Sequence, residues 1–313
     1  MKISQSKVKL FRKCKRAYHY RYVEKLSSKK IAPPLSFGKL VHYILECKAQ
    51  GIEADLDKFS EEELAGIGTN ERLLYQDILD NAQNIMVDYN HYWERSPLNH
   101  VEIDGSKAEH KIELKINDDI TMVGIIDGIV EDENGRKWLL EHKTGKREMS
   151  EEDKWRSLQN AVYYEAMERL DFPPVDGVIW DFILSKEPTK PKLLKSGDVS
   201  KAKIVTLPST VESFIESNPH LSDEDKQDLR AKSEIGLTKY FKRSYNIKNS
   251  NVKKSLFDGF VETAEEIVRD HDKSKAMCID QHCSWCPYRD LCRAELENAD
   301  VDFVRERNYT TND

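Results

Sequence analysis

Two carboxylates and a lysine stand near the ends of two neighbouring segments with strand-like alternation. The first segment contains GIID, which ends at Asp127, and the second contains LLEHKTG, with Glu141 and Lys143 two residues apart. Side chains alternate between the faces of a strand, so Glu141 and Lys143 share one face while His142 points the other way. A hairpin joining the two strands would bring Asp127 beside Glu141.

Two adjacent carboxylates repel each other unless a cation neutralises them. A hard divalent ion such as Mg²⁺ or Mn²⁺, bound through oxygen atoms, meets that need and could also activate water and polarise a phosphate. Lys143 would then balance charge that develops on the phosphate. The alternative is a surface hairpin in which Glu141 and Lys143 form an ordinary cross-strand pair.

Cysteines form a second candidate site near the C-terminus. The motif CSWCPYRDLC contains Cys283, Cys286 and Cys292, which is one thiolate short of the four ligands of a zinc or iron–sulfur centre. Either Cys278, which is close in sequence, or the remote Cys14 could complete the set. The chain shows no export signal, so we expect a cytoplasmic protein whose cysteines are not structural disulfides.

Positive charge is concentrated in two places on an acidic chain. The net charge is −7, yet residues 1–30 carry eleven Lys or Arg and only one acid, Glu24. Residues 239–254 carry six more basic residues, interleaved with aromatic ones. Basic patches with aromatic side chains suit contact with a nucleic acid. The candidate DNA contacts are Arg12, Lys13, Lys15, Arg16, Lys242 and Arg243, although lysine-rich stretches are also common on solvated faces.

The periodicity predicts a mixed α/β fold. Helical spacing extends to about residue 98, an antiparallel meander occupies 108–143, and a helix is expected at 151–170. Strands follow at 178–184 and 203–207, and the chain from 211 to 270 reads as helical, broken by a basic, asparagine-rich loop at 246–251. No apolar run approaches the ~20 residues that span a bilayer, so no membrane partner is expected.

These elements suggest three parts. Residues 1–100 would form an N-terminal helical segment, 101–210 a core that carries Asp127, Glu141 and Lys143, and 211–313 a C-terminal helical region with the cysteines. The strand from Ile120 to Glu131 is expected to be continuous, with Asp127 inside it.

Four motifs occur in an order that resembles the PD-(D/E)XK nuclease superfamily, and within it the RecB-like branch. They are FGKLVHYILE, GIID, EHKTG and LQNAVYYEA. The resemblance implies a mixed sheet flanked by helices, with N- and C-terminal helical segments joined by a metal cluster. It also implies site residues: His42, Asp127, Glu141 and the backbone carbonyl of His142 as ligands of Mg²⁺ or Mn²⁺, Lys143 as the catalytic lysine, and Gln159 and Tyr163 as further active-site residues.

RecB-like nucleases that hold an iron–sulfur cluster have one cysteine before the nuclease core and three after it. This resemblance implies that Cys14, Cys283, Cys286 and Cys292 bind a 4Fe–4S cluster. The residues alone leave open a zinc ion, and they leave open Cys278 as the fourth ligand. Cys47 and Cys278 would otherwise be a buried and a loose thiol.

The expected activity is metal-dependent hydrolysis of DNA, by an exonuclease that acts on free or single-stranded ends in recombination, repair or mobile-element replication. The alternatives are a structure-selective endonuclease, a nuclease of CRISPR spacer acquisition, and a non-catalytic DNA-binding subunit. The chain has no Walker A motif, so any helicase activity would require a recombination or helicase partner.

Overall fold

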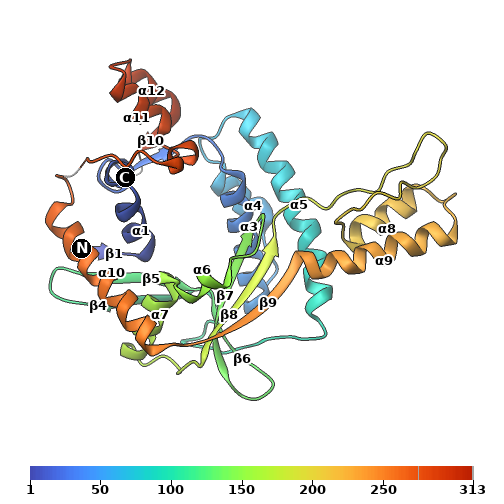
Figure 1. Cartoon of the computed structure of the whole chain (residues 1–313), viewed down its shortest axis with the longest axis horizontal. Coiled ribbons are helices and arrows are strands. Elements are labelled where there is room, and N and C mark those ends of the chain that lie inside the picture. The colour runs from blue at the N-terminus through green and yellow to red at the C-terminus, as the bar shows by residue number, and fades with distance from the viewer. Residues whose placement is uncertain (274, 312–313) are drawn as a thin grey trace.

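Two sheets occupy the centre of the molecule in a computed structural model that describes residues 1–273 and 275–311 (Figure 1). The larger sheet has the strand order β3-β6-β7-β8-β9. Its strands are β3 (Asn99–His100), β6 (Gly128–Glu131), β7 (Lys137–Gly145), β8 (Gly177–Leu184) and β9 (Phe241–Ile247). β7 and β8 run parallel, and the other neighbouring pairs are antiparallel. The expected mixed α/β architecture is confirmed.

The smaller sheet has the order β1-β5-β4, from strands Lys2–Ile3, Thr121–Ile126 and His110–Lys115. The prediction of one continuous strand over 120–131 is wrong, because β5 and β6 belong to different sheets and Asp127 lies between them. Both halves are apolar, so the sequence pattern carries no sign of the break. The break places Asp127 where the two sheets meet.

Helices cover both faces of the larger sheet. Helices α3 and α5 pack against Ile183 and Phe241 on one face, while α7 and α10 join a core with Leu139 and Trp180 on the other. The helices are α1 (Gln5–Lys13), α2 (Lys15–Tyr18), α3 (Pro33–Gln50), α4 (Leu56–Glu63), α5 (Thr69–Trp93), α6 (Glu151–Trp155), α7 (Leu158–Arg169), α8 (Pro208–Ser217), α9 (Asp223–Tyr240), α10 (Ser250–Asp270), α11 (Arg289–Leu296) and α12 (Val301–Asn308), with a π-helical turn at His19–Val23 and a 3₁₀ turn at Gln281–Trp285.

Local sequence signals start and stop the helices that hold the site. The Ser157 side chain accepts a hydrogen bond from the backbone N–H of Asn160 and caps α7. Gly51, with φ of 72°, ends α3 in the left-handed conformation that glycine tolerates best. In α1, Val8 and Phe11 lie one turn apart and are both buried; burying each contributes roughly 1.5–3 kcal/mol.

Two further secondary-structure predictions are wrong. No strand forms at 203–207, and residues 241–247 form β9 rather than part of a helix. Strand β8 is buried along nearly its whole length. Its backbone groups need hydrogen-bonding partners, which β9 supplies.

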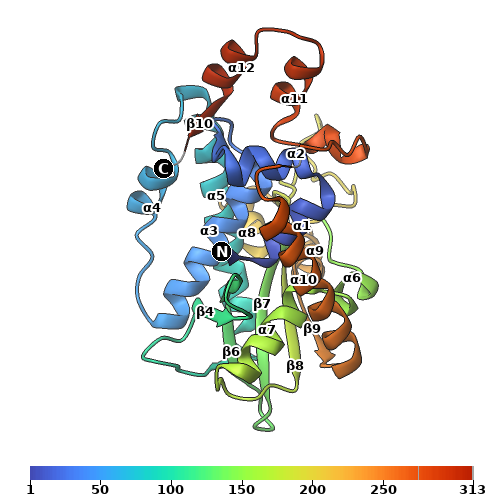
Figure 2. The same cartoon turned by 90° about the vertical axis from the view of Figure 1, so that its left-hand side faces the viewer.

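An N-terminal and a C-terminal segment of the chain pair beside α2. Strand β2 (Leu26–Ser28) pairs with β10 (Tyr309–Thr311), and Tyr20 and Leu291 pack together in a small core there. Figure 2 shows α11, α12 and β10 gathered on that side of the molecule. No helix in the described ranges is long and apolar enough to cross a membrane.

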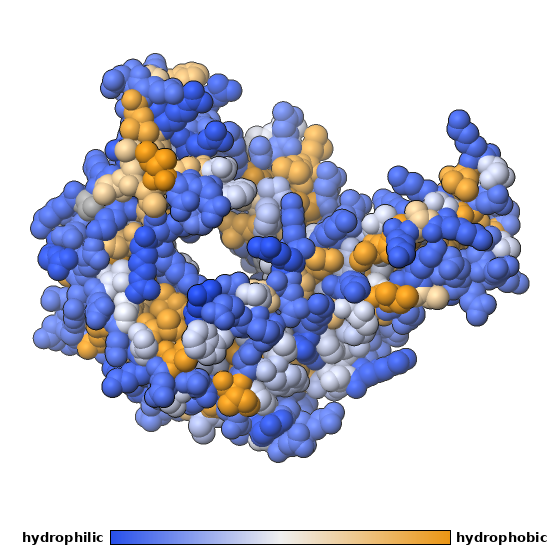
Figure 3. Space-filling view, in the orientation of Figure 1, coloured by the Kyte–Doolittle hydropathy of each residue, from blue (hydrophilic) through white to orange (hydrophobic). Residues whose placement is uncertain are grey.

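Figure 3 shows an opening that passes through the molecule, surrounded largely by hydrophilic side chains. In the same orientation, Figure 1 places α1 on one side of this opening, α3 on the other and β7 at its lower edge. Helices α8 and α9 form an arm that projects from the body, with a small apolar core of its own.

Candidate active site

The break between β5 and β6 turns the Asp127 carboxylate toward β7. Gly128 pairs with Leu140, so Asp127 lies next to Glu141 across the strands. Asp127 is 8% exposed, and its Oδ2 accepts a hydrogen bond of 2.7 Å from the backbone N–H of His142. The hairpin therefore brings the two carboxylates together, as the sequence pattern predicted.

Glu141 is buried but incompletely paired. Its Oε1 accepts hydrogen bonds from Gln159 Nε2, at 2.7 Å, and from Lys143 Nζ. Its Oε2 is buried with no hydrogen-bonding partner in the structure. Burial and the charge of Asp127 outweigh the attraction of Lys143 and raise the pKa of Glu141 to about 7. The Oε2 atom of Glu141 thus has no positively charged group paired with it among the described residues.

Lys143 lies on the same face of β7 and stays partly exposed, with 30% of its side chain accessible. Burial disfavours its charged form, but the carboxylates of Glu141 and Asp127 outweigh this effect and raise the pKa of Lys143. Its ammonium group is therefore charged at neutral pH and accessible to a substrate.

Helix α7 supplies two polar side chains to this face. Gln159 Oε1 lies 3.3 Å from Lys143 Nζ, and Gln159 Nε2 lies 3.5 Å from the Tyr163 hydroxyl. The two residues are one turn apart, so both face the strand. Burial, followed by the charges of Glu141 and Asp127, raises the pKa of Tyr163, so this phenol is protonated and can only be a neutral hydrogen-bonding group.

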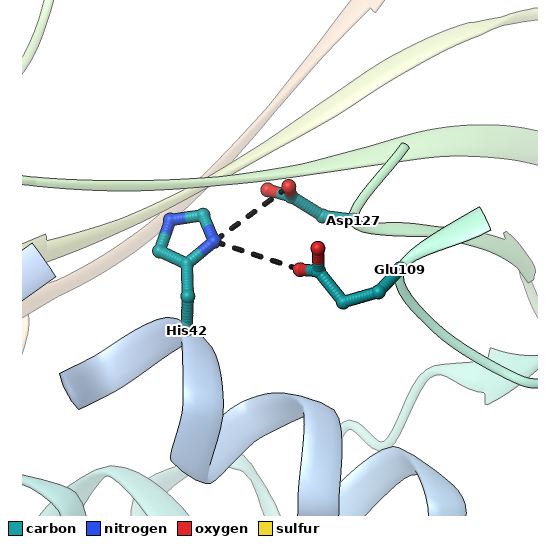
Figure 4. Close-up of side chains that lie close together, drawn as sticks. All are labelled: His42, Glu109 and Asp127. Carbon is teal, nitrogen blue, oxygen red and sulfur yellow. Dashed lines mark ion pairs between the residues drawn. The ribbon is translucent and has the colours of Figure 1, made fainter. Parts of the chain in front are cut away.

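His42 of α3 approaches Asp127 from the other side (Figure 4). Its Nδ1 lies 3.6 Å from Asp127 Oδ1 and 4.0 Å from Glu109 Oε1. One ligand atom from each of the three residues lies within 4.8 Å of the others. Burial disfavours the imidazolium, yet Asp127 and Glu109 outweigh it and raise the pKa of His42 to about 8.

Glu109 was missed by the sequence reasoning. It precedes β4 and adopts a φ of 52°, which is uncommon for a residue other than glycine. Its backbone N–H donates to the Asp127 carbonyl at 3.1 Å, which holds this conformation beside the site. The available signal was an acidic residue directly before an alternating strand, in Ala108-Glu109-His110.

These donors fit a hard divalent cation. Carboxylate oxygens of Asp127 and Glu109 and an imidazole nitrogen of His42 converge here. Glu141 lies beside Asp127 across the strands, and its Oε2 has no hydrogen-bonding partner among the described residues. Oxygen ligands with an added imidazole suit Mg²⁺ or Mn²⁺. A cation bound here would polarise a phosphoryl oxygen and increase the acidity of water.

Comparison with known families agrees with this geometry. The model of the PD-(D/E)XK nuclease superfamily matches residues 2–293. The chain belongs to the PD-(D/E)XK nuclease superfamily. No match is found among the curated proteins.

A close approach of α3 to β7 sets the position of His42 in this PD-(D/E)XK protein. A Cβ added at Gly38 would lie 3.1 Å from Thr144 Oγ1 on β7. Gly38 and His42 are one helical turn apart on the same face. The glycine therefore lets the helix lie close enough for His42 to reach Asp127.

Replacing Gly38 with alanine is expected to weaken Mn²⁺ binding about tenfold, the lower end of the effect of disturbing groups that orient metal ligands. The added methyl group pushes α3 away from Thr144 and draws His42 back. Calorimetric titration with Mn²⁺ measures this change. The double variant G38A/T144A removes the obstructing oxygen and should recover most of the affinity, while G68A, where an added Cβ meets nothing within 4 Å, should have no effect. Equal affinity of G38A and the unaltered protein would contradict this role.

The raised pKa values predict how pH acts on stability without metal. An unfolded Glu titrates near 4.3 and an unfolded His near 6.5. Because the pKa of Glu141 is higher in the folded than in the unfolded state, the folded state loses stability as pH rises to about 7. The stabilisation by charged His42 is lost in the same way as pH rises through about 8. We expect the melting temperature of the metal-free protein to fall between pH 5 and pH 8.5.

Glu141→Gln should make this fall shallower. Mg²⁺ should raise the melting temperature more at pH 8 than at pH 5, because its ligands must be deprotonated; a concentration of 100 times Kd stabilises by about 2.7 kcal/mol. Melting curves across this pH range, with and without Mg²⁺, provide the measurement. A Mg²⁺ effect that is larger at pH 5 would contradict the assignment.

The opposite face of the sheet holds a buried row of charges. His142 Nδ1 lies 2.8 Å from Asp181 Oδ2, and Arg243 Nε donates to Asp181 Oδ1 at 3.1 Å. The three residues are register neighbours on β7, β8 and β9. Tyr89 also donates to Asp181, and the Arg243 guanidinium lies 3.8 Å from the ring centroid of Trp93. These contacts hold β7 in place on the face of the sheet opposite Glu141 and Lys143.

Most of the predicted DNA-contacting residues make internal contacts. Five of the six cations have a partner on another element: Arg12 with the Thr263 hydroxyl and the Gly259 carbonyl, Lys15 with Glu266, Arg16 with Glu295, Lys242 with Glu148, and Arg243 with Asp181. Lys13 is exposed and makes no ion pair within the described ranges. Contact of these six residues with DNA stays a prediction.

A lysine of α1 that the sequence did not single out interacts with the charged residues of β7. Lys9 is exposed, and the surrounding protein atoms together with the positive charge of Lys143 lower its pKa, while Glu141 opposes the shift. Lys9, in the basic N-terminal segment, thus lies within electrostatic reach of Lys143 and Glu141 on β7.

Five cysteines line one pocket of about 250 Å³ between α2 and α11. They are Cys14, Cys278, Cys283, Cys286 and Cys292. Among the described residues, however, no three cysteine sulfurs lie within 4.8 Å of one another. Burial, and the charges of three neighbouring thiols, raise the pKa of Cys286. Cys47 is buried elsewhere, in α3.

Proposed function

We propose that the chain is a Mg²⁺- or Mn²⁺-dependent deoxyribonuclease that hydrolyses phosphodiester bonds. The observation that carries the proposal is the meeting of Asp127, Glu141 and Lys143 at one point, with Glu141 Oε2 buried and unpartnered. A nuclease needs a cation there, and a charged lysine beside it for the anionic transition state. Membership of the PD-(D/E)XK superfamily supports the same reaction.

The side chains of the site would have different roles in hydrolysis. Asp127, Glu141 and His42 would hold the cation, with Glu109 beside them. Lys143 would orient water and stabilise the charge that develops on the phosphate. Gln159 holds both Glu141 and Lys143 by hydrogen bonds and fixes their separation.

A DNA strand with a free end is the proposed substrate, as in the RecB-like branch. The opening between α1 and α3 has β7 at its edge, so a strand passed through it would reach β7, which carries Lys143 (Figures 1 and 3). Lys9 of α1 is close enough to Lys143 for the two charges to interact, which adds positive charge on this side. A strand that must be threaded requires an end, and this favours an exonuclease over an endonuclease.

End-labelled linear DNA and covalently closed circular single strands, each with Mg²⁺, Mn²⁺ or EDTA, test this proposal. We expect linear DNA to be degraded with either metal, circles to persist, and EDTA to stop the reaction. Cutting of circles would show an endonuclease and refute threading. No cleavage under any of these conditions would support the non-catalytic alternative.

We also propose that Cys14, Cys283, Cys286 and Cys292 hold a 4Fe–4S cluster. Thiolates around one zinc ion lie about 3.8 Å apart, given Zn–S bonds of about 2.3 Å. The cysteines here line a common pocket but lie further apart than a compact metal site requires. A cluster binds each thiolate through a different iron atom, so it suits more widely spaced ligands.

Anaerobically purified protein is therefore expected to be brown and to contain iron and acid-labile sulfide. Cys14→Ala should lose both, because the cluster would lack one ligand, whereas C278A should keep both. Metal analysis and the visible absorption spectrum measure the outcome. Colourless protein that contains zinc, and that loses it in C278A but not in C14A, would instead support the local four-cysteine site.

A further inference from the structure

The arm carries a basic hairpin that the active site does not use. After β8 the chain runs out along the arm, turns at residues 193–199, and returns through α8 and α9 to β9. The arm is held by its own apolar core, which includes Val199, Val211 and Leu229. Figure 1 shows the arm projecting from the α5 side of the molecule.

The hairpin is an ordered structure. The backbone N–H of Leu194 donates to the Asp198 carbonyl at 2.8 Å, and the N–H of Ser200 donates to the Lys192 carbonyl at 2.8 Å. Gly197 completes the turn with a φ of 92°, a conformation that favours glycine. Val199, 4% exposed, anchors the returning strand in the arm core. The side chains at the tip are thus presented from a fixed backbone.

Positive charge is unusually dense on this segment. Residues 186–203 contain six lysines and two acids and so carry a net charge of +4. Because the whole chain has a net charge of −7, the remaining residues together carry −11. Within the described part of the chain, one of these lysines forms an ion pair, an exposed contact of 3.9 Å between Lys190 and Glu187. All six are exposed: Lys186, Lys190, Lys192, Lys195, Lys201 and Lys203. Like charges held this close repel each other until a polyanion neutralises them.

The tip also exposes apolar side chains. Leu193 and Leu194 are 37% and 53% exposed and stand between Lys192 and Lys195. Aliphatic side chains flanked by cations are found in proteins that contact the minor groove or the base steps of a duplex. Duplex DNA carries one negative charge per about 1.7 Å of its axis, which makes it a dense counterpart for these lysines.

We infer that this hairpin, residues 186–203, binds the duplex part of a DNA substrate whose single-stranded end enters the opening. This inference rests on the proposed function, which supplies the single strand. The arm begins at the end of β8, beside the catalytic strand β7. A duplex that lies outside the opening would therefore have the arm beside it.

The test measures binding separately from cleavage. Variants are made in a K143A background, and binding is followed with a labelled duplex that carries a single-stranded tail, at several salt concentrations. K192E/K195E is expected to weaken binding about tenfold or more. The slope of log affinity against log salt concentration should be smaller in magnitude by about two, since each lost phosphate contact lowers this magnitude by about 0.9. The control K58E/K115E makes the same change in net charge on α4 and at the end of β4, and should bind like the parent.

Short single strands that lack a duplex should bind equally to both variants. Equal loss of duplex binding in K192E/K195E and K58E/K115E would overturn the inference, as would unchanged binding in K192E/K195E. Vesicles with anionic lipid provide a further measurement. Binding of the parent to vesicles but not to duplex, abolished by K192E/K195E, would assign the hairpin to a lipid surface. Absence of cleavage by protein that has Lys143 would refute the nuclease proposal alone and leave the binding result standing.

Discussion

Replacing Lys143 with alanine is expected to lower the rate of DNA cleavage by about 10³-fold, the effect of removing a strong electrostatic contact to a transition state. Lys143 pairs with the buried Glu141, and 30% of its side chain remains accessible. Its loss removes charge stabilisation from the phosphate. Rates with saturating Mg²⁺ and DNA isolate this step from binding.

The control for Lys143→Ala is K137A, at the other end of the same strand. Lys137 makes an exposed ion pair of 3.3 Å with Glu131, far from the carboxylates in the strand register, so K137A should cleave at the parent rate. Lys143→Arg should recover only part of the rate, because the planar guanidinium cannot occupy the position of the compact ammonium group. A K143A protein that folds, binds Mg²⁺ and cleaves within tenfold of the parent rate would refute the proposed role.

Replacing Arg243 with methionine is expected to lower the free energy of unfolding by about 3–5 kcal/mol, as removal of one partner from a buried ion pair does. Asp181 is 0% exposed, and Arg243 is its cationic neighbour on β9. His142 and Tyr89 also bond to Asp181 and hold its charge in place, and the pKa of Asp181 is lowered because these hydrogen bonds and charges outweigh burial. Without Arg243 the Asp181 carboxylate would stay buried with much less positive charge beside it to offset the loss of hydration.

Urea unfolding of Arg243→Met measures this effect beside K242M, its neighbour on the same strand. Lys242 pairs with Glu148 at 2.9 Å, with 44% of the lysine side chain exposed. Exposed pairs contribute about 0–1 kcal/mol, so K242M should unfold like the parent. Unchanged stability of Arg243→Met together with weakened DNA binding would contradict the structural role and favour the sequence-based assignment of Arg243 to the DNA surface.

The arrangement of charged residues on β7 could be predicted from the sequence because its geometry is local. Alternation places Glu141 and Lys143 on one face, and a short hairpin places Asp127 beside them. Gln159 and Tyr163 were implied by the family resemblance, and their one-turn spacing places both on the same face of a helix. The structure brings all five residues together.

The remaining features depend on contacts between distant segments. Glu109 reaches the site only because the backbone bends at Asp127 and holds Glu109 by a hydrogen bond. The apolar run over 120–131 gave no sign of that bend. β9 forms because β8 is buried and needs a partner, a demand that its own sequence does not display.

Charge patterns were the least specific signal. A run of basic residues does not reveal which side chains turn inward, and Arg243 proved to be buried against Asp181. Arg16 likewise lies 3.2 Å from Glu295, beside the cysteine pocket. The lysines at 186–203 attracted no DNA assignment from sequence, although all six are exposed and only Lys190 among them forms an ion pair within the described part of the chain. Pairing depends on the tertiary structure.

The most direct test of the metal-dependent site is the anomalous scattering of Mn²⁺ soaked into crystals of the protein. We predict a peak at ligand distance from carboxylate oxygens of both Asp127 and Glu141, with His42 adjacent, and loss of that peak in crystals of Glu141→Gln. A peak held by surface carboxylates alone, or no peak between Asp127 and Glu141 at saturating Mn²⁺, would contradict the account.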